Sequence, residues 1–183
     1  MLACRYLLNL GIENIFRAAY GLVVCFACVT STVANSTVLS GVVIRIVDGD
    51  TIELQTADMQ SVNIRLAGID APEKNQDFGQ RAKQELTRLC FRQRSEADVR
   101  AQDRYGRTVA RVRCNGVDAA SKMLSVGLAW HFSRYASTQP KQEADDDREA
   151  QETAKQLHQG LWSMPNPKAP WDWRAIQKSS SPP

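Results

Sequence analysis

The chain has 183 residues, which is enough for one domain with a sizeable core and too few for two of ordinary size. Apolar residues make up 43% and charged residues 23% of the chain, which excludes a disordered polyelectrolyte and a fibrous repeat. The formal net charge of +3 is too small for the overall field of the protein to hold a polyanion, so any nucleic-acid site must be local.

The first 34 residues have the pattern of an export signal. Residues 18–29 are an uncharged, mainly apolar run of 12 residues, shorter than the stretch of about 20 that spans a bilayer. Thr32 and Ala34 follow it and offer a small-x-small cleavage site. We therefore expect residues 1–34 to be a cleaved signal peptide, with a secreted or periplasmic mature protein that has no membrane span. An uncleaved envelope anchor is the alternative.

Two cysteines remain once residues 1–34 are removed, Cys90 and Cys114. Export sends the chain to an oxidising compartment, where an even number of cysteines favours a disulfide. A pair of buried free thiols is the alternative, because unpaired cysteine behaves as a small apolar side chain.

Hydrophobic alternation predicts strands in the first half of the mature chain. Residues 42–54 alternate on both sides of Asp48-Gly49, which is typical of two strands joined by a tight turn. Residues 61–67 alternate with their apolar side chains on one face and Arg65 on the other. Residues 97–112 contain two further short strands around the segment 103–107.

Helical spacing of apolar residues predicts helices over 79–91, 117–126 and 143–157. The acidic run 145–147 is interpreted as the solvated start of the last helix. Residues 175–183 are expected to be a disordered polar tail. The order of strands and helices predicts an α+β fold in which short antiparallel strands close into a small barrel. Tryptophans near the C-terminus are expected to wrap that segment onto the body: Trp162, Trp171 and Trp173.

Charged side chains gather at the predicted strand ends. Carboxylates of Asp50 and Asp70, with a backbone carbonyl and waters, would suit a hard cation such as Ca²⁺. Arg65 and Arg107 would offer forks of donors that match phosphate oxygens. A phosphodiester is therefore the natural substrate of such a site.

Three segments together are highly specific: VDGDT at 47–51, IRLAGIDAPE at 64–73 and DRYGRTVARV at 103–112. In this order they resemble the signature blocks of the staphylococcal nuclease (thermonuclease) family, and the resemblance extends over about residues 42–162. It implies that residues 35–174 form an OB-type five-stranded β-barrel with three α-helices. It also implies a monomeric Ca²⁺-dependent endonuclease that cuts DNA and RNA and leaves 3′-phosphate ends.

The resemblance assigns roles to individual residues. It implies that Asp50 and Asp70 bind Ca²⁺ directly, that the backbone carbonyl of Ala71 is a third ligand, and that Asp48 holds a coordinated water from the second shell. Glu73 is the implied general base for the attacking water.

Two arginines and two tyrosines complete the implied site. Arg65 and Arg107 would stabilise the charge of the transition state, and Tyr105 and Tyr135 would contact the nucleotide. The alternative is a non-catalytic OB-type nucleic-acid-binding module, anchored in the cell envelope or exported to it. The presence of all the acids and arginines favours the enzyme.

Overall fold

The computed structural model describes residues 37–133 and 139–180, and these belong to one compact unit, Asn35–Pro183. The predicted signal peptide, 1–34, and the predicted nucleotide contact Tyr135 lie outside the described residues. Within the described ranges, no helix combines the length and the apolar character that crossing a bilayer requires.

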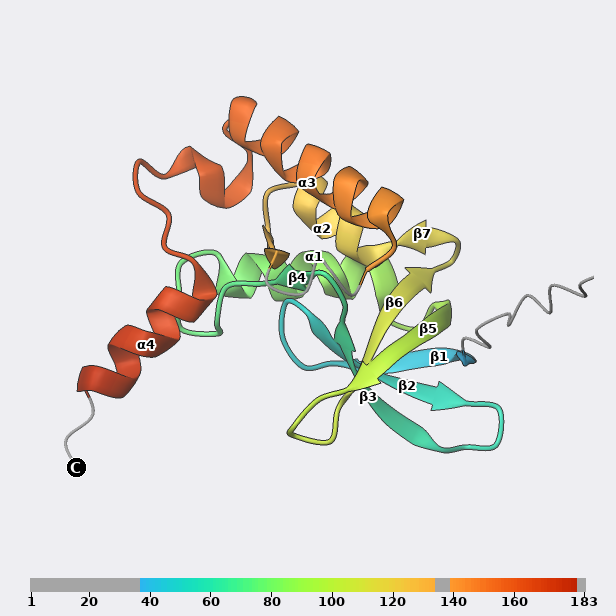
Figure 1. The fold of residues 1–183 in the computed structure, drawn as a ribbon. Coiled ribbons are helices and arrows are strands. Elements are labelled where there is room, and N and C mark those ends of the chain that lie inside the picture. The colour runs from blue at the N-terminus through green and yellow to red at the C-terminus, as the bar shows by residue number, and fades with distance from the viewer. Residues whose placement is uncertain (1–36, 134–138, 181–183) are drawn as a thin grey trace, which may run out of the picture. The chain divides into compact units, whose positions relative to one another are not determined.

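A closed five-stranded barrel forms the first half of the unit (Figure 1). Neighbouring strands are antiparallel in the order β3-β2-β1-β5-β6, and a parallel pairing of β3 with β6 closes the barrel through Ile64 opposite Thr108 and Leu66 opposite Ala110. The predicted α+β fold and OB-type barrel are confirmed. The barrel strands are β1 (Val38–Ile46), β2 (Thr51–Thr56), β3 (Ser61–Leu66), β5 (Arg94–Gln102) and β6 (Thr108–Cys114).

Apolar side chains at alternate positions along the strands fill the barrel. Ile52 and Leu54 of β2 and Ile64 and Leu66 of β3 are fully buried, because every second residue of a strand points to the same face. Arg65 lies between two of these core residues and is directed to the other face, as its position in the alternation predicts.

In the part of the chain that the structure describes, four α-helices accompany the barrel, one more than the three expected: α1 (Gly79–Cys90), α2 (Ala119–Ser125), α3 (Lys141–Gln156) and α4 (Pro170–Ser180). A 3₁₀ turn, η2 (Gly160–Ser163), follows α3. The predicted start of α2 at 117 is two residues early, because Val117–Asp118 form the short strand β7 and Asp118 accepts a hydrogen bond from the backbone of Ser121 at 3.0 Å. Asp118 is therefore the N-cap of α2.

Helix α4 changes the interpretation of the C-terminus. Residues 175–180 were expected to begin a disordered tail, but they continue α4 to Ser180. The side chains from Arg174 onward are exposed, so the sequence here lacks the pattern of buried apolar residues that predicts a helix. Its helix begins at Pro170, a residue favoured in the first turn because its fixed φ suits a helix and its missing N–H has no partner there.

The acidic run at the start of α3 is only partly solvated, which corrects the sequence interpretation. Asp147 is 0% exposed, and both of its carboxylate oxygens accept hydrogen bonds from Arg111 of β6, at 2.7 and 2.9 Å. Arg111 also donates to Asp118 at 2.6 Å. Asp145, two residues away, forms exposed pairs with Lys141 and Arg148. The buried pair therefore ties α3 to the barrel and to the start of α2.

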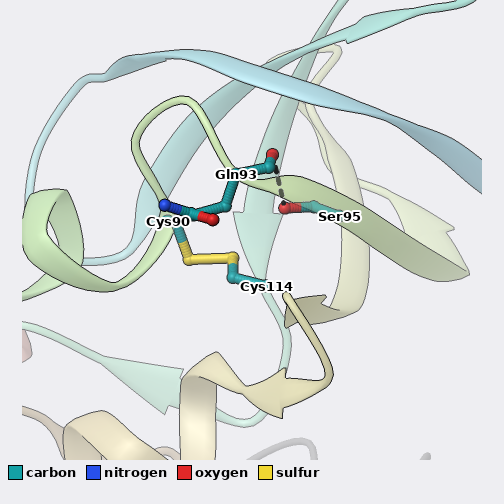
Figure 2. The surroundings of a disulfide bond; sticks show 4 residues. All are labelled: Cys90, Gln93, Ser95 and Cys114. Atoms are coloured by element: carbon teal, nitrogen blue, oxygen red, sulfur yellow. Dashed lines mark hydrogen bonds between the residues drawn. A yellow bond between two sulfur atoms is a disulfide. The ribbon is translucent and has the colours of Figure 1, made fainter.

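A disulfide joins the end of α1 to the end of β6 (Figure 2). The sulfur atoms of Cys90 and Cys114 are 1.98 Å apart, and both residues are buried. The turn after α1 is ordered by a hydrogen bond from the Gln93 backbone to the Cys90 carbonyl at 3.0 Å and by Ser95 Oγ donating to the Gln93 carbonyl. The helix is thus linked covalently to the strand that carries Arg111.

We predict that Asp147→Ala lowers the free energy of unfolding by about 3 to 5 kcal/mol, because the change leaves Arg111 buried without its main counter-charge. Asp146→Ala removes an acid from the exposed face of the same helix and should change stability by less than about 0.5 kcal/mol. Denaturant unfolding of both variants checks this. Equal losses in the two variants would contradict it.

Candidate active site

The turn between β1 and β2 carries two of the acids. The backbone N–H of Asp50 donates to Asp48 Oδ1 at 3.1 Å, and Thr51 Oγ1 donates to Asp50 Oδ1 at 3.1 Å. Gly49 between the acids packs so closely that a Cβ there would lie 2.7 Å from the Cβ atoms of both Ala71 and Ala82. A side chain at position 49 would therefore force the turn away from α1.

The second acidic segment is bound directly to this turn. The backbone N–H of Ala71 donates to Asp50 Oδ2 at 2.7 Å, and the N–H of Leu66 donates to the Asp50 carbonyl at 2.8 Å. Asp70 belongs to β4 (Ile69–Asp70), which pairs with β8 (Trp130–His131) and places Asp70 opposite Trp130. Two acids that are 20 positions apart in the sequence are thus held by the same backbone network.

Arg65 lies between the two acids. Its Nη1 is 3.1 Å from Asp50 Oδ2, and its Nη2 donates to Asp70 Oδ1 at 2.9 Å. Both carboxylates are buried, so one guanidinium provides charge compensation to each of them. The structure therefore brings together the two acids and the first arginine that the sequence selected.

Arg107 approaches the same pocket from the turn between β5 and β6. Asp103 orders this turn by accepting hydrogen bonds from the backbone N–H groups of Tyr105 and Arg107, and it also accepts from Arg107 Nε at 2.8 Å. Arg107 Nη1 is 3.5 Å from Thr51 Oγ1, beside Asp50. Tyr105 is 70% exposed and stacks near Arg107, with 5.7 Å between the guanidinium carbon and the ring centre.

These groups line one pocket of about 950 Å³. Its wall includes Asp48, the two acids with Arg65, Ala71 and Glu73 from the second segment, and Tyr105 and Arg107 from the opposite turn. The predicted site residues within the described ranges therefore line a single concave surface, apart from the two cysteines, which belong to the disulfide.

Arg174 of α4 is a charged site residue that sequence reasoning missed. Its Nη2 donates to Asp70 Oδ2 at 2.7 Å, its Nη1 is 3.3 Å from Asp70 Oδ1, and the same Nη1 donates to Glu73 Oε1 at 2.6 Å. One guanidinium thus contacts both oxygens of Asp70 and one oxygen of Glu73. The hydrogen bonds to Asp70 raise the pKa of Arg174 further above its ordinary value, so the side chain is cationic.

Aromatic packing holds the start of α4 beside the pocket. The ring of Trp171 lies 5.7 Å from that of Trp130 and 5.4 Å from that of Phe132, and Trp130 lies 4.4 Å from Trp162. The predicted aromatic packing of the C-terminal segment is therefore confirmed for Trp162 and Trp171. Trp171 and Arg174 are three residues apart, the helical spacing that puts two side chains on one face, and this spacing was the sequence signal for Arg174.

Burial changes the proton affinity of the acids. Burial and the neighbouring Asp50 carboxylate raise the pKa of Asp48 to about 6. Burial also raises the pKa of Asp70 above its ordinary value, although Arg174 and Arg65 oppose the shift. Each carboxylate is thus destabilised as an anion by its surroundings, which is the electrostatic condition under which an added cation binds favourably.

The donor set suits an oxygen-bound cation in part. No group of three or more His, Cys, Asp or Glu side chains in residues 37–133 and 139–180 could hold a metal ion. Asp50 and Asp70 nevertheless converge on one cationic group, Arg65, which shows that their oxygens face a common point of positive charge. Together with the Ala71 carbonyl and water they would give the oxygen ligands that Ca²⁺ accepts.

Acids and arginines converge at one rim of a closed barrel, and arginine side chains are suited to binding phosphate oxygens. The sequence profile described as "Staphylococcal nuclease homologue" matches residues 63–164. The chain therefore belongs to the staphylococcal nuclease family, as its sequence motifs indicated, and is an endonuclease, a hydrolase of nucleic acids.

Individual relatives agree with this assignment. The chain is 37% identical over 152 residues to the "Micrococcal nuclease" of Shigella flexneri, covering 77% of this chain and 83% of the relative. It is 39% identical over 147 residues to "Protein ParB" of Escherichia coli, covering 74% and 79%. An "Uncharacterized endonuclease" of Haemophilus influenzae is 38% identical over 136 residues, covering 74% and 73%.

We predict that Arg65→Gln lowers the free energy of unfolding in the absence of divalent ions by about 1 to 3 kcal/mol, because two buried carboxylates lose a shared cation. Arg45→Gln is the matched control, since Arg45 pairs with Glu53 on the exposed surface. That control should lose less than about 1 kcal/mol in denaturant unfolding. An Arg65 variant as stable as the control would contradict this account of the site.

Proposed function

We propose that this protein is a Ca²⁺-dependent endonuclease that hydrolyses phosphodiester bonds in both DNA and RNA and leaves 3′-phosphate ends. The observation that carries the proposal is the convergence of Asp50 and Asp70 on the guanidinium of Arg65, in a pocket that Arg107 also lines. Family membership supports the reaction class. The ion, the range of substrates and the product ends are the proposed parts.

Asp50, Asp70 and the backbone carbonyl of Ala71 are the proposed protein ligands of Ca²⁺, and Asp48 would hold one of its waters. When bound, the ion would supply Lewis-acid polarisation of a non-bridging phosphate oxygen. The N–H of Ala71 already donates to Asp50, which fixes the acid and the peptide of the proposed carbonyl ligand relative to each other.

Glu73 is the proposed general base. It follows Asp70 by three residues and lines the same pocket, and its half-exposed carboxylate can reach water. It would accept a proton from the water whose oxygen attacks phosphorus. The 5′ P–O bond would then break, the 5′ oxygen would take a proton from solvent water and leave as a hydroxyl, and the phosphate would stay on the 3′ side.

Arg65 and Arg107 are the proposed electrostatic catalysts. Arg65 comes from a strand and Arg107 from a turn ordered by Asp103, and both side chains line the pocket. Their forks would donate to phosphate oxygens as negative charge accumulates. Tyr105, exposed at the rim, is the proposed nucleotide contact, and Tyr135 keeps this role from the sequence resemblance.

The mature protein is proposed to act outside the cytoplasm, secreted or periplasmic, after removal of residues 1–34. The pattern of an apolar run followed by small residues supports export, and a disulfide between Cys90 and Cys114 suits an oxidising compartment. Action as a monomer is proposed from the sequence resemblance.

We predict that the purified protein degrades single-stranded DNA and RNA when Ca²⁺ is present and stops when the ion is chelated, because the two acids alone cannot polarise the phosphate. Gel electrophoresis of a labelled oligonucleotide checks cleavage, and phosphatase sensitivity of the product ends checks for 3′-phosphate. Full activity in excess chelator would contradict the proposed mechanism, and binding without cleavage would support the non-catalytic module instead.

A matched pair of variants localises the activity. Arg107→Ala should lower kcat by about two orders of magnitude, as removal of a transition-state donor does elsewhere. Arg113→Ala removes the same charge from an exposed position on β6, in the strand that begins next to Arg107. Equal activities of the two variants would remove Arg107 from the reaction.

A further inference from the structure

We propose that Arg174 is a phosphate-binding residue for the nucleic-acid substrate, held on Asp70 and Glu73 before Ca²⁺ binds and released to a substrate phosphate when Ca²⁺ takes Asp70. This inference rests on the proposed function, because it takes Asp70 as a ligand of the ion. It adds a role for α4 (Pro170–Ser180), which carries none of the residues assigned to the site from the sequence.

The contacts of Arg174 are incompatible with the proposed roles of its partners. Arg174 lies within hydrogen-bond distance of both oxygens of Asp70, and these are the oxygens proposed to bind Ca²⁺. It also donates to Glu73 at 2.6 Å, and an acid that is paired with a guanidinium is a weaker proton acceptor. Arg174 must therefore leave at least one of these acids before Asp70 can bind the ion and Glu73 can accept a proton.

Charge gives the direction of the exchange. A divalent ion brings twice the charge of a guanidinium to the same carboxylate oxygens, and both cations cannot contact Asp70 at once without repulsion. Arg65 contacts the same acid, with its Nη2 2.9 Å from Asp70 Oδ1. The Arg174 side chain is 47% exposed and that of Arg65 is 16% exposed, so Arg174 is the arginine with more room to leave Asp70 when the ion binds.

The helix limits where the released guanidinium can go. Trp171, one turn earlier, is packed against Trp130 and Phe132 and does not depend on the acids. The connection before α4 is fixed independently, because Gln76 Nε2 donates to the Lys168 carbonyl at 2.7 Å. The side chain of Arg174 is 47% exposed and can change rotamer without repacking a core. Arg174 thus stays at the pocket, within reach of a phosphate that enters it.

A phosphate is the chemical partner that fits. Guanidinium forks bind carboxylates and phosphates in the same bidentate way, so a group that leaves Asp70 can form equivalent bonds to a phosphodiester. With Ca²⁺ on the acids, the charge of the pocket becomes positive and the incoming strand is the anion that compensates it. Arg174 would then add affinity for the strand in the presence of the ion and none in its absence.

The test compares Arg174→Gln, Arg174→Lys and the control Lys178→Gln, which removes one charge from an exposed position about one turn further along α4. Isothermal titration calorimetry measures Ca²⁺ binding to each full-length protein without substrate. Fluorescence anisotropy measures binding of a labelled single-stranded phosphorothioate oligonucleotide, whose linkages resist hydrolysis, in Ca²⁺ and in chelator.

We expect Arg174→Gln to lower the Kd for Ca²⁺ by about 3- to 10-fold relative to wild type, because the ion no longer displaces a paired cation. In Ca²⁺ the same variant should bind the oligonucleotide about 3- to 10-fold more weakly, and in chelator its affinity should be within about twofold of wild type. Arg174→Lys keeps the charge and loses the guanidinium fork, so its Kd values should lie between those of wild type and Arg174→Gln. The Kd values of Lys178→Gln should match those of wild type.

Two results would overturn the proposal. Unchanged Ca²⁺ affinity in Arg174→Gln would show that Arg174 does not compete with the ion. A loss of oligonucleotide affinity that is equal in Ca²⁺ and in chelator, or is absent in Ca²⁺, would show that the released side chain does not bind phosphate. If wild type fails to cut an ordinary strand, the proposed function fails, while both binding measurements still test Arg174.

Discussion

Two buried carboxylates within reach of the same guanidinium are the constraint on which the rest of this structure depends. Asp50 and Asp70 are buried at the rim of a barrel, where an unpaired negative charge is costly. Arg65 comes from a barrel strand and compensates both acids, and Arg174 from the C-terminal helix adds a second cation to Asp70. The site is therefore a cluster of paired charges, in which the carboxylates suit an added cation and the guanidiniums suit a phosphate.

The scaffold explains why the cluster holds its geometry. Closure of the barrel by the parallel β3–β6 pairing brings Arg65 opposite Val109, two residues after Arg107, so distant parts of the sequence meet at one rim. Away from the pocket, the Arg111–Asp147 pair fixes α3 to β6, and the disulfide fixes α1 to the end of the same strand. These links hold α1 and α3 to the barrel whose strands and turns carry the acids, Arg65 and Arg107.

Sequence reasoning recovered the features that local patterns encode. Alternation predicted the strands and the outward direction of Arg65, and the three motifs selected the acids and arginines that line the pocket. It failed where a long-range partner decides the outcome. Asp145 and Asp147 are alike in sequence, and only the position of Arg111 on a distant strand buries one of them. Arg174 was missed for the same reason, since its partners lie about 100 positions earlier.

The proposed reaction requires that Asp50 and Asp70 share one divalent ion and that the arginines around them bind phosphate. The most direct test is a crystal structure of the mature protein grown with Ca²⁺ and a short oligonucleotide that resists cleavage. We expect one ion in contact with Asp50, Asp70 and the Ala71 carbonyl, with Arg65, Arg107 and Arg174 on phosphate oxygens. An ion bound elsewhere, or carboxylates still paired with Arg65 and Arg174 beside bound nucleic acid, would contradict it.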